Sequence, residues 1–152
     1  MKFCLLCVVL VCVLLVAIVN LNYYRTKSRV IGELIDFYKC YANEISFLKL
    51  SVSEIVAKHE VKYSKVTQKI LQNYLNCQPN LTCFNDYEQS EIINGFASIG
   101  KMDVVSEIQY CNGVIEKLQN MKKSIDETSK TKGELRSKLI VIVGIILILL
   151  LI

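Results

Sequence analysis

Residues 94–103, NGFASIGKMD, decide how this chain folds back on itself, because they carry two of its six glycines. A glycine inside a helix costs about 1 kcal/mol relative to alanine, so Gly95 and Gly100 each need a structural reason. Gly100 directly follows Ile99, and the position after a helix end favours glycine, because a left-handed backbone there carries no Cβ penalty. The stretch therefore predicts that one helix ends near Ile99.

A second helix is expected to begin at the other end of the same stretch. Asp103 stands three residues after Gly100, and its carboxylate can accept hydrogen bonds from the free N–H groups of a helix start. We therefore expect a tight corner between two antiparallel helices. Gly95 lies one turn before the corner, where its expected use is the close approach of another helix. Because such a turn lets a foreign backbone come close, our candidate interaction residues are Gly95, Phe96, Gly100 and Asp103.

Apolar residues recur at helical spacing on both sides of the corner. One stripe, with steps of three and four, is formed by Ile31, Leu34, Tyr38, Tyr41, Ile45 and Leu48. A second stripe is formed by Val104, Ile108, Cys111, Ile115, Leu118, Met121 (or Lys122) and Ile125. Strict alternation, the pattern of strands, is almost missing. The sequence therefore predicts an all-α bundle of about four to five helices.

The breaks in the pattern give the expected helix boundaries. The first helix should run from Val30 to about Leu50, and residues 76–82, which hold the only proline, should form a loop. A short second helix should be capped by Ser53 and end at His59, and a third should span Val61 to Leu75 with Val66, Ile70 and Tyr74 on one face. The last two should span Asn85 to Ile99 and Val104 onward into the C-terminal apolar run.

Two apolar runs flank this bundle. Phe3–Leu21 carries no charge and has the length of one membrane-spanning helix. A cleaved signal peptide is the rival interpretation, but Ala17–Asn20 fits a cleavage site poorly, so we expect an uncleaved anchor.

The second run, Leu139–Ile152, holds 14 residues. As a helix it would span about 21 Å, short of a hydrocarbon core of about 30 Å. Arg136 and Lys138 can extend it by snorkelling, so we expect a second membrane segment. The alternative is a helix that packs into the middle domain. The expected domains are therefore an anchor at 1–21, a helical bundle at 22–138 and an anchor at 139–152.

Basic residues next to the two runs predict the orientation. Arg25, Lys27 and Arg29 follow the first run, and Arg136 and Lys138 precede the second. The positive-inside rule then places the bundle in the cytoplasm, and the same side chains favour anionic lipid headgroups. The formal net charge of +4 comes mostly from these flanks, so it does not indicate nucleic-acid binding.

The sequence offers little for catalysis, a cofactor or a metal. It lacks nucleophile-elbow, zinc-protease and phosphate-loop motifs. His59 is the only histidine and lies between Lys58 and Glu60, so we interpret it as a solvated side chain. The seven cysteines include Cys77 and Cys83 as the one close pair in the bundle, and in a reducing cytosol they should be free thiols.

The opening stretch also resembles a known family pattern, in which an acid and Ile precede Phe-Gly-x-x-Leu-Gly-x-x-Asp and a later Gln. The matching residues here are Glu91-Ile92, Phe96, Gly100, Asp103 and Gln109. Ala97 replaces the first glycine of the pattern, and Ile99 replaces its leucine. The pattern is that of the stage III sporulation protein AB family of endospore-forming bacteria.

Two further stretches carry the same resemblance. Glu44-Ile45-Ser46-Phe47 is followed by Ser51-Val52-Ser53-Glu54, where the family shows a Pro-Leu-x-Glu turn. Near the C-terminus Leu139 and Gly144 fit the family, whereas Ile140 replaces a glycine. The resemblance covers residues 25–152 in order and length.

The resemblance implies a function that the residues alone do not give. Members of the family belong to a machine made in the mother cell, which sits in the outer forespore membrane and faces a channel to the spore. Their soluble domain is similar to the cytoplasmic domains of the type II secretion inner-membrane platform protein. The chain would thus be a non-enzymatic integral membrane scaffold, and its partners would be membrane lipids, other stage III sporulation membrane proteins and a cytoplasmic ATPase, stage III sporulation protein AA.

Two other classes of function stay open. The first is a membrane-tethered coiled coil, unrelated to sporulation, in which the two stripes would zip between copies of the chain. Its long heptads should have few interruptions, whereas the pattern here breaks near residues 50, 77 and 100. The second is an enzyme with thiol chemistry at Cys77 and Cys83.

Overall fold

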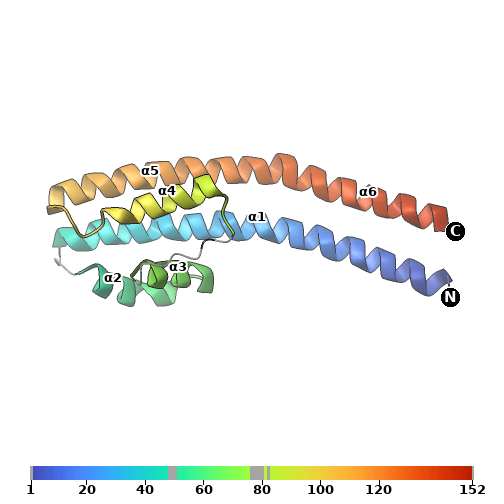
Figure 1. Ribbon diagram of the computed structural model, residues 1–152, viewed down its shortest axis with the longest axis horizontal. Coiled ribbons are helices and arrows are strands. Elements are labelled where there is room, and N and C mark those ends of the chain that lie inside the picture. Colours follow the sequence, from blue (N-terminus) through green and yellow to red (C-terminus); the bar gives the residue numbers. More distant parts are fainter. Residues whose placement is uncertain (1, 48–50, 76–80, 82, 152) are drawn as a thin grey trace. The chain divides into compact units, whose positions relative to one another are not determined.

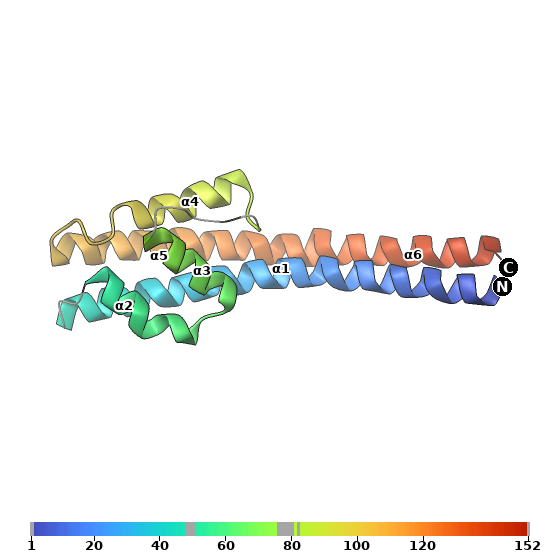
Figure 2. The same cartoon turned by 60° about the horizontal axis from the view of Figure 1, so that its bottom comes forward.

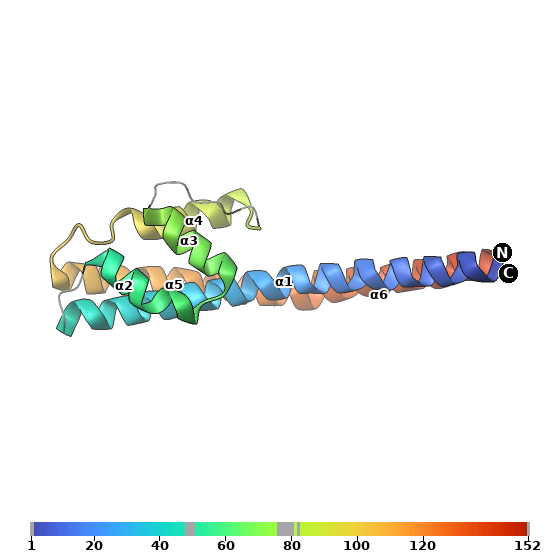
Figure 3. The ribbon, with the colours of Figure 1, turned by 90° about the horizontal axis from the view of Figure 1, so that it is seen from below.

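The computed structural model describes residues 2–47, 51–75, 81 and 83–151, and every regular element in these ranges is helical. The all-α prediction is therefore confirmed for the described residues. The chain forms two compact units, Lys27–Lys123 and Met1–Thr26 with Ser124–Ile152. Figures 1, 2 and 3 show the elements from three sides.

The unit Lys27–Lys123 is built around helix α1. This helix is continuous over Lys2–Phe47, so the separate start expected at Val30 is wrong. The other helices are α2 (Val52–His59), α3 (Lys65–Leu75), α4 (Asp86–Ala97) and α5 (Val104–Thr128), with a 3₁₀ turn, η1, at Glu60–Lys62. Side chains of α1 contact each of these four helices, as the bonds below show, so α1 is the central element of the unit.

The predicted stripe of α1 forms the core. Ile31, Leu34, Tyr38, Tyr41 and Ile45 are all buried, whereas Leu48 lies outside the described residues. Helix α5 buries Cys111, Leu118, Met121 and Ile125 of its stripe, while Val104 remains 41% exposed. Both stripes are thus covered within the same chain, which argues against a coiled coil zipped along them.

An aromatic cluster joins α1, α3 and α4. The Phe96 ring lies 4.6 Å from that of Tyr74, 5.5 Å from that of Tyr38 and 6.2 Å from that of Phe37, measured between centroids. Buried aromatic pairs at these distances add roughly 0.5–1.5 kcal/mol each beyond the area they bury. Phe96 therefore holds three helices together.

Helix α2 begins two residues earlier than predicted. Ser51, not Ser53, caps it: the Ser51 N–H donates to Glu54 Oε2 at 2.8 Å, and the Glu54 N–H points back to Ser51 Oγ at 3.4 Å. This reciprocal pair is a capping box, which satisfies two backbone donors at once.

Helix α3 turns most of its predicted face to the core, since Ile70 is buried and the Tyr74 ring packs on Phe96, but Val66 is an exception. Thr67, Ile70 and Leu71 are buried, whereas Val66 is 38% exposed. The reason is a carboxylate of α1: Glu33 Oε2 accepts from the Ser64 N–H at 3.0 Å, from Ser64 Oγ at 2.7 Å and from Thr67 Oγ1 at 2.5 Å. These bonds draw the start of α3 onto α1 and rotate Val66 outward.

In the unit Met1–Thr26 with Ser124–Ile152, a five-residue π-helical turn at Ser129–Gly133 separates α5 from α6 (Glu134–Leu151). Because α5, this turn and α6 follow one another without a gap, the helical path expected from Val104 into the C-terminal run is confirmed, and the π-helical turn is an irregularity within it. Both chain termini lie at the same end of this unit in all three views. Within the ranges that the structure describes, no helix combines the length and apolar character needed to cross a membrane.

Candidate interaction site

The corner between α4 and α5 has the predicted geometry. Gly100 adopts a φ of +76°, the left-handed conformation that favours glycine. Asp103 Oδ2 accepts from the Ser106 N–H at 3.1 Å, so Asp103 caps α5, and the hydrogen bonding by Ser106 lowers its pKa. The one correction is that α4 ends at Ala97, two residues before the expected Ile99.

Glu107, which the sequence did not single out, holds the corner together. Its carboxylate accepts from the Gly100 N–H at 2.6 Å, from the Met102 N–H at 3.2 Å and from Tyr41 Oη at 3.0 Å. The Glu107 side chain is only 3% exposed. Burial and the Glu107 charge raise the pKa of Tyr41, so the phenol stays a donor. One carboxylate thus fixes the backbone of the corner and ties it to α1.

Gly95 permits the close helix approach that was predicted. A Cβ at this position would lie 3.0 Å from Tyr38 Oη on α1 and 3.1 Å from Val114 Cγ1 on α5. Such distances are tighter than ordinary van der Waals contact, so the three helices meet here only because residue 95 has no side chain. Phe96, the next candidate, is 3% exposed and belongs to the core rather than to a surface that a partner could reach.

The exposed part of the corner is therefore smaller than the predicted face and differs from it. Gly100 and Asp103 are exposed, and beside them Met102, Val104 and Val105 are 45%, 41% and 69% exposed. We call these five residues the corner surface. Apolar side chains on a rigid turn are typical of binding surfaces, but whether this surface binds a partner stays a prediction.

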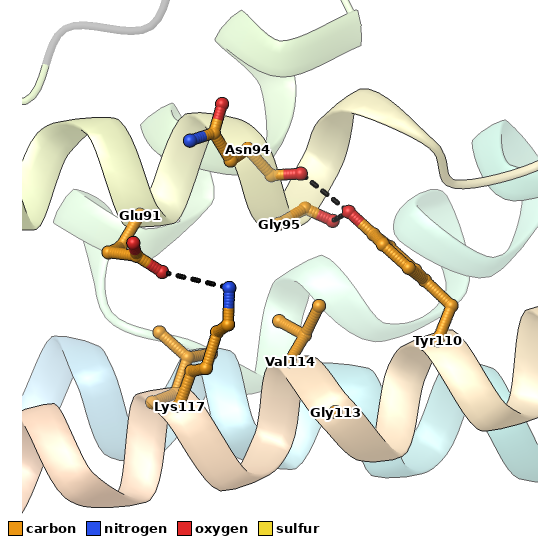
Figure 4. A pocket seen from close by; sticks show the side chains of 8 residues that line it. Glu91, Asn94, Gly95, Tyr110, Gly113, Val114 and Lys117 are labelled. Atoms are coloured by element: carbon orange, nitrogen blue, oxygen red, sulfur yellow. Dashed lines mark hydrogen bonds and ion pairs between the residues drawn. The ribbon is translucent and has the colours of Figure 1, made fainter.

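A pocket of about 350 Å³ lies between α4 and α5 (Figure 4). Tyr110 Oη closes one end by donating to the carbonyls of Asn94 and Gly95, the latter at 3.1 Å. At the other end Lys117 Nζ lies 3.5 Å from Glu91 Oε2, as the dashed line in Figure 4 shows. The remaining lining residues are Gly113, Val114 and Leu118.

The basic residues predicted to lie beside the membrane do not behave alike. Lys27 is 7% exposed, and its Nζ lies 2.6 Å from Glu88 Oε2 on α4, so its assignment to lipid headgroups is wrong. Arg25, Arg29 and Lys138 are exposed, and the side chain of Arg136 lies outside the described residues. Glu88 also completes a capping box with Asn85, so the ion pair and the start of α4 share one carboxylate.

His59 is not the solvated residue that was expected. Its Nε2 lies 2.6 Å from Glu44 Oε1 on α1, and its side chain is 20% exposed. Lys58 Nζ reaches the same oxygen at 2.7 Å. Both bonds hold the pKa of Glu44 below its ordinary value of 4.5, and the bond from Lys58 has the larger effect. Glu44 thus fastens the end of α2 to α1.

This cluster predicts an acid-dependent part of the stability. The pKa of Glu44 is lower in the folded state than in the unfolded state. Its contribution to the free energy of unfolding is therefore fully present above the pKa of the unfolded state, and it is lost as the pH falls through the pKa of the folded state. The Glu44→Gln variant should therefore melt at a lower temperature than the wild type at about pH 6, and the difference should shrink toward about pH 3. Circular dichroism of the full-length chain measures both melting temperatures. Glu116→Gln, at an exposed position of α5, is the control, and a pH-independent difference for Glu44→Gln would contradict the assignment.

Thiol and metal chemistry gain no support from the described residues. Cys83 and Cys40 are half-buried and are not joined in a disulfide, and Cys111 is buried, with its pKa raised by burial to about 12. Cys77, the other half of the close pair, lies outside the described residues. Among the described residues, no group of three histidine, cysteine or acidic side chains could hold a metal ion.

Comparison with known proteins gives one match. The sequence model of the stage III sporulation protein AB family matches residues 62–152, which include α3, α4, the corner and α5. No curated protein and no solved structure matches the chain significantly.

Proposed function

The chain belongs to the stage III sporulation protein AB family and has a role in stage III sporulation, and from this we propose that it is a membrane-anchored scaffold of a secretion-like complex between mother cell and forespore. The proposed mechanism is positioning. The apolar runs 3–21 and 139–152 anchor the chain, and the helical unit presents the corner surface to other subunits, among them a cytoplasmic ATPase.

The observation that carries this proposal is that buried and half-buried carboxylates of the unit hold its helices together. Glu33, Glu88 and Glu107 each accept bonds that join helices or cap their ends. Catalytic acids and bases are instead aimed at a cleft where a substrate can reach them. These carboxylates support a rigid body that displays the corner surface, not a reaction centre.

The position of the two chain ends supports the anchoring. Both termini lie at one end of their unit, as expected for two antiparallel segments that cross a bilayer and return. The basic side chains of Arg25, Arg29 and Lys138, which are exposed, would then meet the cytoplasmic face of the membrane.

A topology measurement tests the proposal. We expect the exposed Lys101→Cys thiol, placed in the corner in a background without the native cysteines, to resist a membrane-impermeant maleimide in intact growing cells and to react once the cells are opened. A Lys2→Cys variant in the same background is the control and should react in intact cells. Reaction of Lys101→Cys in intact cells would invert the topology and remove a cytoplasmic ATPase as a direct partner.

A further inference from the structure

Among the residues that the structure describes, nothing around position 113 requires a glycine. Gly113 lies in the interior of α5, where glycine weakens a helix relative to alanine. A Cβ built on Gly113 would meet no atom within 4 Å, in contrast to one on Gly95. Gly113 is exposed and forms part of the pocket wall. The missing side chain keeps the pocket open toward the outside, which is useful only if something enters it.

Tyr87 is a protruding aromatic side chain on the same side of α4 as Glu91. It precedes Glu91 by one turn of α4 and is 70% exposed. Among the described residues no hydrogen bond or ring contact involves it. Large aromatic side chains of this kind are enriched at protein interfaces, because they bury much area for few rotatable bonds.

The charges at the pocket rim are of both signs. Glu91 comes from α4 and Lys117 from α5, and the Lys117 side chain is 69% exposed. At 3.5 Å this is a weak surface pair, so either group can exchange its partner for an equivalent one. The face therefore offers a protruding ring, a pocket, an acid and a base. A two-fold interface needs such self-complementarity, because the same patch must serve on both copies.

We propose that this α4–α5 face, made of Tyr87, Glu91, Gly113 and Lys117 around the pocket, binds the same face of a second copy of the chain. The Tyr87 ring of each copy enters the pocket of the other. Glu91 of each copy pairs with Lys117 of the other. The contact uses residues other than the corner surface, so a dimer would still present two corner surfaces to further subunits.

Filling the pocket tests the contact without harming the fold. In the full-length chain, purified in detergent, light scattering should give a protein mass of two copies. Gly113→Leu should keep or raise the melting temperature, since leucine is the better helix former and a Cβ at this position meets no atom within 4 Å. It should weaken dimerisation by about thirtyfold. Lys69→Leu places the same side chain on the exposed side of α3 and should dimerise as the wild type does. A monomeric wild type, or a Gly113→Leu dimer of wild-type affinity, would overturn the proposal.

Charge exchange then tests the pairing across the interface. Glu91→Lys and Lys117→Glu should each weaken self-association. In either variant, residue 91 of one copy and residue 117 of the other carry charges of the same sign and repel each other. An equimolar mixture of the two variants should associate again, since every unlike pair is restored between a copy of one variant and a copy of the other. If the mixture associates no better than the separate variants, the proposed pairing is wrong.

Discussion

Replacing Glu107 by alanine is expected to destabilise the unit Lys27–Lys123 by about 3 kcal/mol, the largest effect of a single carboxylate in the corner. Three donors lose their acceptor in this variant: the Gly100 N–H, the Met102 N–H and the Tyr41 hydroxyl. A buried donor left without a partner costs about 1–3 kcal/mol. Tyr41, which is 2% exposed, has no access to replacement water.

Denaturant unfolding of the full-length chain, followed by circular dichroism, measures this effect. Glu107→Gln keeps a carbonyl oxygen at the site and should lose only about 1 kcal/mol. Glu116→Ala makes the same chemical change at an exposed position of α5 and should stay within about 0.5 kcal/mol of the wild type. If Glu107→Ala is as stable as Glu116→Ala, the carboxylate does not hold the corner.

The second large effect is expected at the buried ion pair of α1 and α4. Lys27→Met removes the ammonium group and leaves the Glu88 carboxylate buried without its counter-ion. The side chains of Lys27 and Glu88 are 8% and 9% exposed, and their charged atoms lie 2.6 Å apart. Removing one partner of such a pair destabilises a protein by about 3–5 kcal/mol, so the midpoint of denaturant unfolding should fall steeply.

The double variant separates charge from packing. With Glu88→Gln added to Lys27→Met, no charge remains buried, and glutamine can still accept from the Asn85 N–H as glutamate does at 2.8 Å. Most of the lost stability should therefore return, because an ion pair replaced as a whole is often nearly neutral. A double variant no more stable than Lys27→Met would show that the lysine acts through its packing.

What the sequence could predict was local. The left-handed Gly100, the cap at Asp103 and the stripe of α1 each depend on residues within a few turns of one another, and all three are confirmed. Glu107 stands in the first turn of α5, unlike Glu116, but an acid at that position does not by itself reveal a buried acceptor. Its carboxylate also reaches Tyr41, 66 residues earlier in the chain, and that contact exists only in the folded structure.

The same limit explains the corrections. Lys27 stands next to an apolar run, so its charge suggested a membrane flank, yet its partner Glu88 follows 61 residues later. Val66 fits the helical period, but the bonds of Ser64 and Thr67 to Glu33 decide which face of α3 packs inward. Only the folded structure brings these groups together.

The reach of Glu107 also limits how the corner can vary in length. Most turns between helices accept an inserted residue, because nothing beyond the turn depends on its length. Here an acid seven positions after Gly100 must return to the backbone of that glycine. One residue added within the first turn of α5, before Glu107, would rotate the carboxylate by about 100° around the helix and direct it away from both amides. Chains that share this corner should therefore keep the interval from glycine to acid, even where the residues within it differ.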